Sequence, residues 1–136
     1  MEFQLLKGRF TEEEAKFLNP LVLALIGDAV YEVFIRTYIV SENRTMNVHK
    51  IHIKTVAHVK AKAQSKYMKH IIEYLNEDEM AIFKRGRNTK SNVPKNADIG
   101  EYRWATGFEA LIGYLYILNE EERLEYLLNE IIKVGV

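Results

Sequence analysis

The chain has 136 residues, of which 48% are hydrophobic and 28% charged. This is the composition of a globular domain with its own apolar core, and it excludes a disordered or fibrous chain. There is no cysteine, which excludes disulfides, cysteine-zinc sites and thiol nucleophiles. Nineteen basic residues balance nineteen acidic ones, and a net charge of zero taken alone argues against an anionic partner such as nucleic acid.

Long apolar segments are missing from the sequence. No signal-peptide core opens it, and no later run approaches the roughly 18 apolar residues of a membrane span. We therefore expect a single domain over residues 1–136, located in the cytoplasm and not associated with a membrane.

The first half of the chain is predicted to be helical, because apolar residues recur at helical spacing and few glycines or prolines interrupt them. Thr11 followed by Glu14 is a capping-box pattern. Asn19 before a proline predicts the start of a long helix over residues 20–40. A basic segment then follows, and we expect it to form one short and one long helix ending near residue 75.

The second half continues the all-α pattern. Asn76 with Glu79 repeats the capping box and predicts a helix to about residue 85. Residues 86–100 lack helical periodicity, and a loop of this length in a compact domain is typical of a functional segment. Two further helices are expected over residues 101–118 and 120–133. The predicted fold class is therefore all-α.

Charge is unevenly distributed along the chain. Residues 43–70 contain seven Lys or Arg and residues 84–95 contain five, and neither block contains an acid. If acids were placed at random, so long an acid-free stretch would occur roughly one to two times in a hundred. A surface of one sign suits a phosphate backbone, although a solvated lysine face is the alternative. All four histidines lie in the first block; His49, His52 and His58 lack metal-site spacing and are interpreted as surface or phosphate-contact groups.

Two acids interrupt helices that are otherwise apolar. Gly27 and Asp28 lie within the first long helix, and Glu109 lies in an apolar stretch with Gly107 and Gly113 nearby. Glycine and aspartate are poor helix formers, and a buried carboxylate must be paired, neutralised or bound to metal. We expect the three glycines to let two helix backbones approach closely. Asp28 and Glu109 would then converge and need a cation such as Mg²⁺ or Mn²⁺ between them.

The alternative for each acid is a buried salt bridge, and Glu32 could pair with Arg36 one helical turn away. Neither Asp28 nor Glu109 is specific by itself. Together with the acid-free basic blocks, the two acids suggest metal-assisted phosphodiester chemistry, in which the metal activates water and stabilises charge on the phosphate.

The same residues resemble the ribonuclease III endonuclease domain. The family's first motif ends in L-G-D-A-V, matched by I-G-D-A-V at residues 26–30, and its second motif, F-E-A-L-I-G, is unchanged at residues 108–113. The likeness extends over nearly the whole chain. Further segments are similar to a small bacterial branch of the family that consists of the catalytic domain alone: KRGRN at 84–88, KS at 90–91, PKN at 94–96 and YR at 102–103.

The resemblance implies a ribonuclease III helical fold and a homodimeric, Mg²⁺-dependent endoribonuclease acting on double-stranded RNA, with Mn²⁺ able to substitute. For the small branch it implies maturation of the precursor of large-subunit ribosomal RNA. By position, Asp28 and Glu109 take the catalytic and metal-binding roles. With no separate double-stranded-RNA-binding domain expected, the catalytic domain must bind RNA through its own basic side chains. The candidates are Arg85, Arg87, Lys90, Lys95, Lys50, Lys54 and Lys62.

The sequence departs from the family pattern where full-length ribonuclease III has further acids. Those positions are Leu21, Ala24 and Thr106. We therefore expect the metal to keep more water ligands or to draw on Glu32, and to bind weakly. The missing acids leave open a catalytically inactive helical module that binds RNA or the ribosome, although a pure binder would not need both remaining acids. A helix-turn-helix DNA binder is disfavoured, because the basic residues extend over a loop and long helices.

Overall fold

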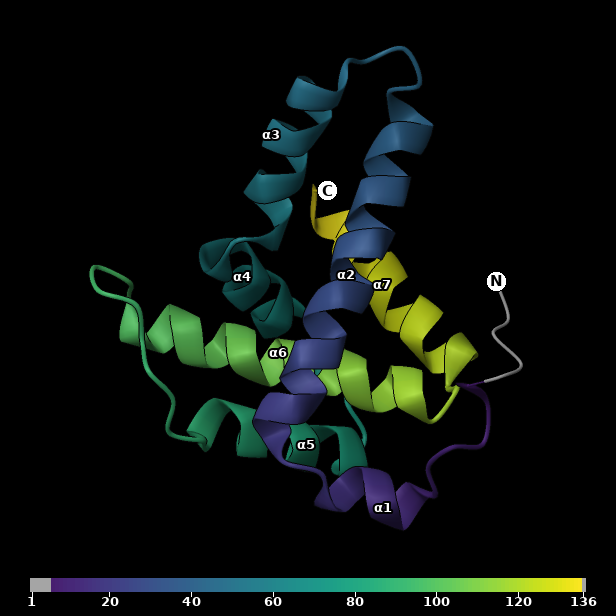
Figure 1. Cartoon of the computed structure of the whole chain (residues 1–136), viewed down its shortest axis with the longest axis vertical. Coiled ribbons are helices and arrows are strands. Elements are labelled where there is room, and N and C mark those ends of the chain that lie inside the picture. Colours follow the sequence, from purple (N-terminus) through teal and green to yellow (C-terminus); the bar gives the residue numbers. More distant parts are fainter. Residues whose placement is uncertain (1–5, 136) are drawn as a thin grey trace.

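The computed structural model describes residues 6–135, and these residues are largely helical and contain no strand, which confirms the all-α prediction (Figure 1). No helix in this part of the chain has both the length and the apolar character that a membrane crossing requires. The elements in chain order are α1 (Glu12–Phe17), α2 (Pro20–Glu42), α3 (Val48–Val59), α4 (Ala61–Ile71), a short 3₁₀ helix (Ile72–Tyr74), α5 (Glu77–Asn88), α6 (Ile99–Ile117) and α7 (Glu121–Gly135).

Side-chain caps start the helices where the sequence predicts them. Thr11 with Glu14 and Asn76 with Glu79 each form a reciprocal capping box, at the beginnings of α1 and α5. The Asn19 side chain accepts a hydrogen bond from the second residue of α2. These bonds satisfy backbone N–H groups that have no partner inside the helix, so the starts of the helices are set by local chemistry.

The basic segment differs from its prediction. It forms two helices of nearly equal length, α3 and α4, and not a short one followed by a long one. Lys60, between them, has an extended backbone. Two buried side chains hold this corner by donating hydrogen bonds to its backbone carbonyls. The Tyr31 hydroxyl donates to the carbonyl of His58, and the Gln64 amide donates to the carbonyl of Val59. One local bond, from Gln64, and one tertiary bond, from Tyr31, thus stabilise the corner between the two helices.

The loop between α5 and α6 is shorter than expected. It covers residues 89–98, because α5 continues to Asn88 and α6 starts at Ile99, where the Asp98 side chain caps it by accepting from the Glu101 N–H. The loop projects from one end of the molecule and connects α5 and α6, which run antiparallel and pack along each other (Figure 1).

The core is organised around α6, which packs against α2, α4, α5 and α7. In Figure 1, α6 crosses α2 near the middle of the molecule, while α2 and α3 form a long hairpin that extends beyond it. Tyr31 of α2, Phe83 of α5 and Phe108 of α6 are fully buried, and the rings of Tyr31 and Phe108 meet edge to face at 4.9 Å. Such contacts are favourable beyond the apolar area they bury.

Glycines bring the backbones of α2 and α6 into direct contact. A Cβ at Gly27 would lie 1.7 Å from the Glu109 carbonyl oxygen, and a Cβ at Gly113 would lie 2.0 Å from the Leu23 carbonyl oxygen. The expected close approach is therefore present. Gly107 has another role, because its missing side chain leaves room for Phe83 of α5. The prediction that Gly107 serves the contact between α2 and α6 is wrong.

Candidate active site

The close contact of α2 and α6 brings the two sequence-predicted acids together. Asp28 directly follows Gly27 on α2, and Glu109 is the residue whose backbone carbonyl faces Gly27. The two side chains are near enough for a hydrogen bond between the carboxyl groups to affect the pKa of Glu109. The structure thus makes one site from residues 81 positions apart in the sequence.

The two acids differ in their exposure. Glu109 is half-buried, whereas Asp28 is exposed to solvent. The expectation of two buried carboxylates is therefore wrong for Asp28. The physical reason is the helix geometry: Gly27 occupies the α2 position that touches α6, so the next residue is rotated out of that contact. An exposed Asp28 leaves the site open to a large ligand.

The electrostatics of the site disfavour two charged carboxylates. Burial raises the pKa of Glu109, and the hydrogen bond and negative charge of Asp28 raise it further, to about 8. A smaller contribution in the same direction comes from the charge of Glu32, while the hydrogen bond from Gln64 lowers the pKa. A divalent cation would relieve the same repulsion that a shared proton relieves.

Salt bridges do not account for the two acids. Among residues 6–135, neither Asp28 nor Glu109 forms an ion pair with a basic side chain. Glu32 does pair with Arg36, with 2.7 Å between Oε2 and Nη2. The salt-bridge alternative thus applies to Glu32 and not to the two acids that converge.

The donor set fits a cation that keeps most of its water. In the part of the chain that the structure describes, no group of three or more His, Cys, Asp or Glu side chains could hold a metal by itself. Mg²⁺ is usually bound by one or two carboxylates, with water and substrate phosphates completing its octahedron. Asp28 and Glu109 match that requirement. Ala24 and Thr106, which replace acids of the family pattern, are both buried and add no charge.

Sequence reasoning missed Gln64 of α4. Its side chain is 2% exposed, and its Nε2 donates to the Val59 carbonyl at 2.9 Å and to Glu109 Oε2 at 3.4 Å. The sequence did offer one signal for Gln64. It is a polar residue between Ala63 and Ser65, on the face of α4 that carries the buried residues.

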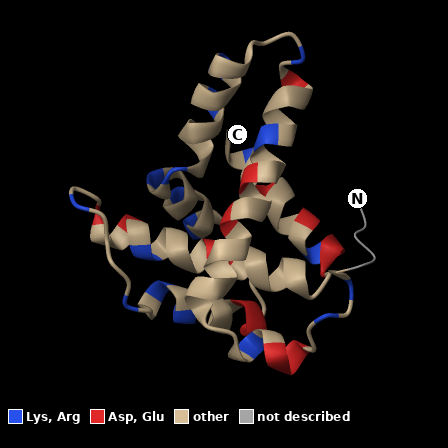
Figure 2. Cartoon of the chain, in the orientation of Figure 1, with Lys and Arg blue, Asp and Glu red and all other residues tan. Residues whose placement is uncertain are grey.

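Most of the candidate RNA-binding side chains lie at the surface. Figure 2 shows basic residues on α3 and α4 and around the end of α5 and the loop that follows it. Arg85 has an additional structural contact, because its guanidinium donates to the carbonyls of Lys16 and Leu18 at the end of α1. Arg87 is half-buried beside the Phe83 ring. The remaining candidates are exposed: Lys50, Lys54, Lys62, Lys90 and Lys95.

The histidines are not uniformly surface groups. His49 and His52 are exposed, but His58 is half-buried, with 2.6 Å between its Nδ1 and the Tyr67 hydroxyl. His70 is also half-buried and lies 3.5 Å from a carboxylate oxygen of Glu130. The interpretation of His49, His52 and His58 as surface or phosphate-contact groups therefore fits the exposed His49 and His52, while His58 is partly buried against Tyr67 of α4.

The fold and the acid pair define the class of protein. A family model described as the Ribonuclease III domain matches residues 21–120, which include both acids. Among solved structures, a crystal structure of a protein from Fusobacterium nucleatum is similar, with a TM-score of 0.79 and 36% identity. The match covers 86% of this chain and 95% of that one.

Curated relatives narrow the class. A Mini-ribonuclease 3 of Clostridium tetani is 60% identical over 126 residues, which are 92% of this chain and 83% of the relative. A Mini-ribonuclease 3 of Thermoanaerobacter is 50% identical over 125 residues, with coverage of 91% and 87%. The chain therefore belongs to the ribonuclease III family, in its Mini-ribonuclease III branch.

The raised pKa of Glu109 predicts that the metal-free protein loses stability as the pH rises. Folding favours the protonated carboxyl of Glu109. Its contribution to the free energy of unfolding is therefore complete below the ordinary pKa of 4.5 and is lost as the pH rises toward about 8. In EDTA, we expect the free energy of unfolding to fall by on the order of 3 kcal/mol more in the wild type than in Glu109→Gln between about pH 5 and pH 8. Urea denaturation measures both profiles, and parallel profiles would contradict the prediction.

Proposed function

We propose that the chain is a metal-dependent endoribonuclease that cleaves double-stranded RNA, with Asp28 and Glu109 as its catalytic, metal-holding residues. The observation that carries the proposal is the convergence of these two carboxyl groups beside Gly27, where neither has a basic partner among residues 6–135. Membership of the ribonuclease III family supports the reaction class.

The two acids have different tasks in this proposal. Asp28 is exposed, so its carboxylate can reach a phosphodiester and the water that attacks it. Glu109 lies deeper, and its carboxylate would hold the cation together with Asp28. Mg²⁺, when bound, would activate the water and stabilise charge on the phosphate, and Mn²⁺ can substitute because it also prefers oxygen ligands.

RNA binding is assigned to the basic blocks. The proposed contacts are those at the end of α5 and in the following loop, together with lysines of α3 and α4. Duplex RNA is recognised mainly by shape, phosphates and 2′-hydroxyls, which exposed basic side chains can contact. The set is Arg85, Arg87, Lys90, Lys95, Lys50, Lys54 and Lys62.

The proposed natural substrate is the precursor of large-subunit ribosomal RNA, cut in the cytoplasm by a chain that is a single catalytic domain. The resemblance to the Mini-ribonuclease III branch supports the substrate. The matches to relatives of similar length support the single domain, since the aligned part covers 83% and 87% of the two relatives described above.

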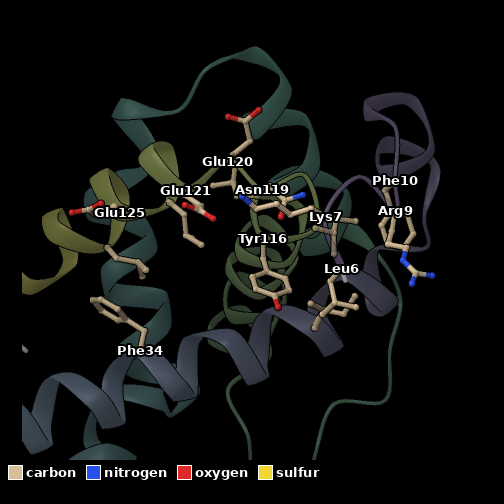
Figure 3. A pocket seen from close by; sticks show the side chains of 15 residues that line it. Leu6, Lys7, Arg9, Phe10, Phe34, Tyr116, Asn119, Glu120, Glu121 and Glu125 are labelled. Carbon is tan, nitrogen blue, oxygen red and sulfur yellow. The ribbon is translucent and has the colours of Figure 1, made fainter. Parts of the chain in front are cut away.

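The proposed assembly is a homodimer formed through α2. Leu25 and Val33 are 73% and 66% exposed and lie on one side of this helix, with the half-exposed Val22 before them. Beside this stripe, Phe34 of α2 and Tyr116 of α6 line a mainly apolar pocket of about 540 Å³ (Figure 3). A second copy would cover this surface and place a second acid pair for the other RNA strand.

The acid pair predicts the effect of an isosteric substitution. Asp28→Asn keeps the size of the side chain but removes the charge that holds the cation, so cleavage of duplex RNA in Mg²⁺ should fall by at least about 100-fold. RNA affinity and helicity should be unchanged. Glu42→Gln, an exposed acid at the end of the same helix, is the control. Retained activity in Asp28→Asn would overturn the assignment. If the wild-type protein binds RNA tightly but yields no product in Mg²⁺ or Mn²⁺, the chain is a binding module and not a nuclease.

The loop predicts a change in the salt dependence of RNA binding. Replacing Arg87, Lys90 and Lys95 by Gln should reduce the slope of log affinity against log salt by about one for each phosphate that is no longer neutralised. Arg85 stays in place because it also holds the end of α1. Lys133→Gln on α7 is the control, and an unchanged slope in the triple variant would remove the loop from the interface.

The apolar stripe predicts that one charge abolishes the dimer. Leu25→Glu places a carboxylate in the proposed interface, and sedimentation velocity should then show a monomer at concentrations where the wild type is a dimer. Val48→Glu, at an exposed position at the start of α3, should leave the dimer intact. A dimeric Leu25→Glu would place the interface elsewhere.

A further inference from the structure

Gln64 is a buried polar side chain in contact with the proposed catalytic acid. It lies in the middle of α4, which packs against α6. Its Nε2 donates both to the Val59 carbonyl, at 2.9 Å, and to Glu109 Oε2, at 3.4 Å. Its Oε1 is buried and has no hydrogen-bond partner among residues 6–135. Burying an amide oxygen without a hydrogen bond is unfavourable for folding.

The hydrogen bond to Val59 orients the amide. Val59 is the last residue of α3, and the bond to its carbonyl holds the Nε2 end of the side chain at the corner between α3 and α4. The same nitrogen then faces Glu109. The corner is itself tied to α2, because the Tyr31 hydroxyl donates to the His58 carbonyl at 2.8 Å. Tyr31 follows Asp28 by three residues on the same helix. One corner thus contacts both helices that carry the acids.

Gln64 and Asp28 have opposite effects on Glu109. Asp28 presents a second negative group and favours protonation of Glu109, whereas the Gln64 amide donates to Glu109 and favours its charged form. The amide carries no charge, so it can hold one carboxylate oxygen without competing with a cation for the site. Groups that hold a metal ligand from behind in this way orient the ligand and strengthen its binding to the metal.

We propose that Gln64 is a positioning residue, which holds the Glu109 carboxylate in the orientation that binds a divalent cation together with Asp28. This inference rests on the proposed function, because the metal-holding role of Glu109 is itself part of that proposal. Gln64 does not touch the substrate, and its effect on cleavage passes through Glu109.

Two substitutions separate the hydrogen bond from the packing. Gln64→Met keeps an unbranched side chain of similar length and removes the donor. Gln64→Asn keeps the amide but is one methylene shorter, so it cannot reach Val59 and Glu109 together. Thr55→Val is the matched control: Thr55 is 1% exposed, its hydroxyl donates to the Ile51 carbonyl, and within residues 6–135 it forms no hydrogen bond with Asp28 or Glu109. This control removes a buried polar group without altering the site.

The direct readout is Mn²⁺ binding to the metal-free protein, followed by the electron paramagnetic resonance signal of free Mn²⁺. We expect both Gln64 variants to bind Mn²⁺ about 10-fold or more weakly than the wild type, and Thr55→Val to bind it as the wild type does. Single-turnover cleavage of duplex RNA should need a Mg²⁺ concentration higher by a similar factor. The affinity for RNA in EDTA should not change.

The outcomes distinguish the two proposals. A folded Gln64 variant with the Mn²⁺ affinity of the wild type overturns the positioning role, whether or not the wild type cleaves RNA. A wild type that binds Mn²⁺ and does not cleave overturns the nuclease, while a loss of Mn²⁺ affinity in the variants still supports the positioning role. A wild type that binds no Mn²⁺ overturns both. Circular dichroism shows which variants are folded.

Discussion

The direct contact between the backbones of α2 and α6 is the constraint on which the site depends. At Gly27 and Gly113 even one methyl group would overlap a carbonyl oxygen of the facing helix. Protein interiors cannot absorb overlaps of this size by small adjustments, so any larger side chain would push the helices apart. The acid pair would then separate, because Asp28 and Glu109 lie directly beside that contact. The glycines are therefore part of the site although they carry no chemistry.

The same contact brings two carboxyl groups together, which disfavours the charged form of Glu109. Burial and Asp28 raise the pKa of Glu109, whereas the hydrogen bond from the Gln64 amide lowers it. Elsewhere the protein does neutralise buried charge: Glu79 is 1% exposed and accepts from the Arg123 guanidinium at 2.7 and 2.8 Å. Among residues 6–135, Glu109 has no such basic partner, and this contrast with Glu79 supports the proposal that Glu109 helps to hold a cation.

Local patterns in the sequence predicted a large part of this structure. The capping pairs at Thr11 and Asn76, the glycine at 27 and the two motifs that carry the acids are short-range signals, and each lies on the expected helix, although Asp28 is exposed and not buried as expected. The sequence did not reveal features that depend on partners far along the chain. The corner at Lys60 is bonded to Tyr31 of α2, 27 residues before His58, and Gln64 reaches Glu109 only when α4 packs against α6.

Distant partners also decide which basic side chains are engaged in the fold and which are exposed to solvent. Counted along the chain, Arg85 is one of five cations in an acid-free block, and nothing in its neighbourhood separates it from Arg87. In the fold, Arg85 donates to two carbonyls at the end of α1, nearly 70 residues away, while the lysines of the loop face solvent. A basic segment read from sequence therefore overstates the charge that is free for phosphates. Under the proposed function, the exposed Lys90 and Lys95 are therefore better candidates for RNA contact than Arg85.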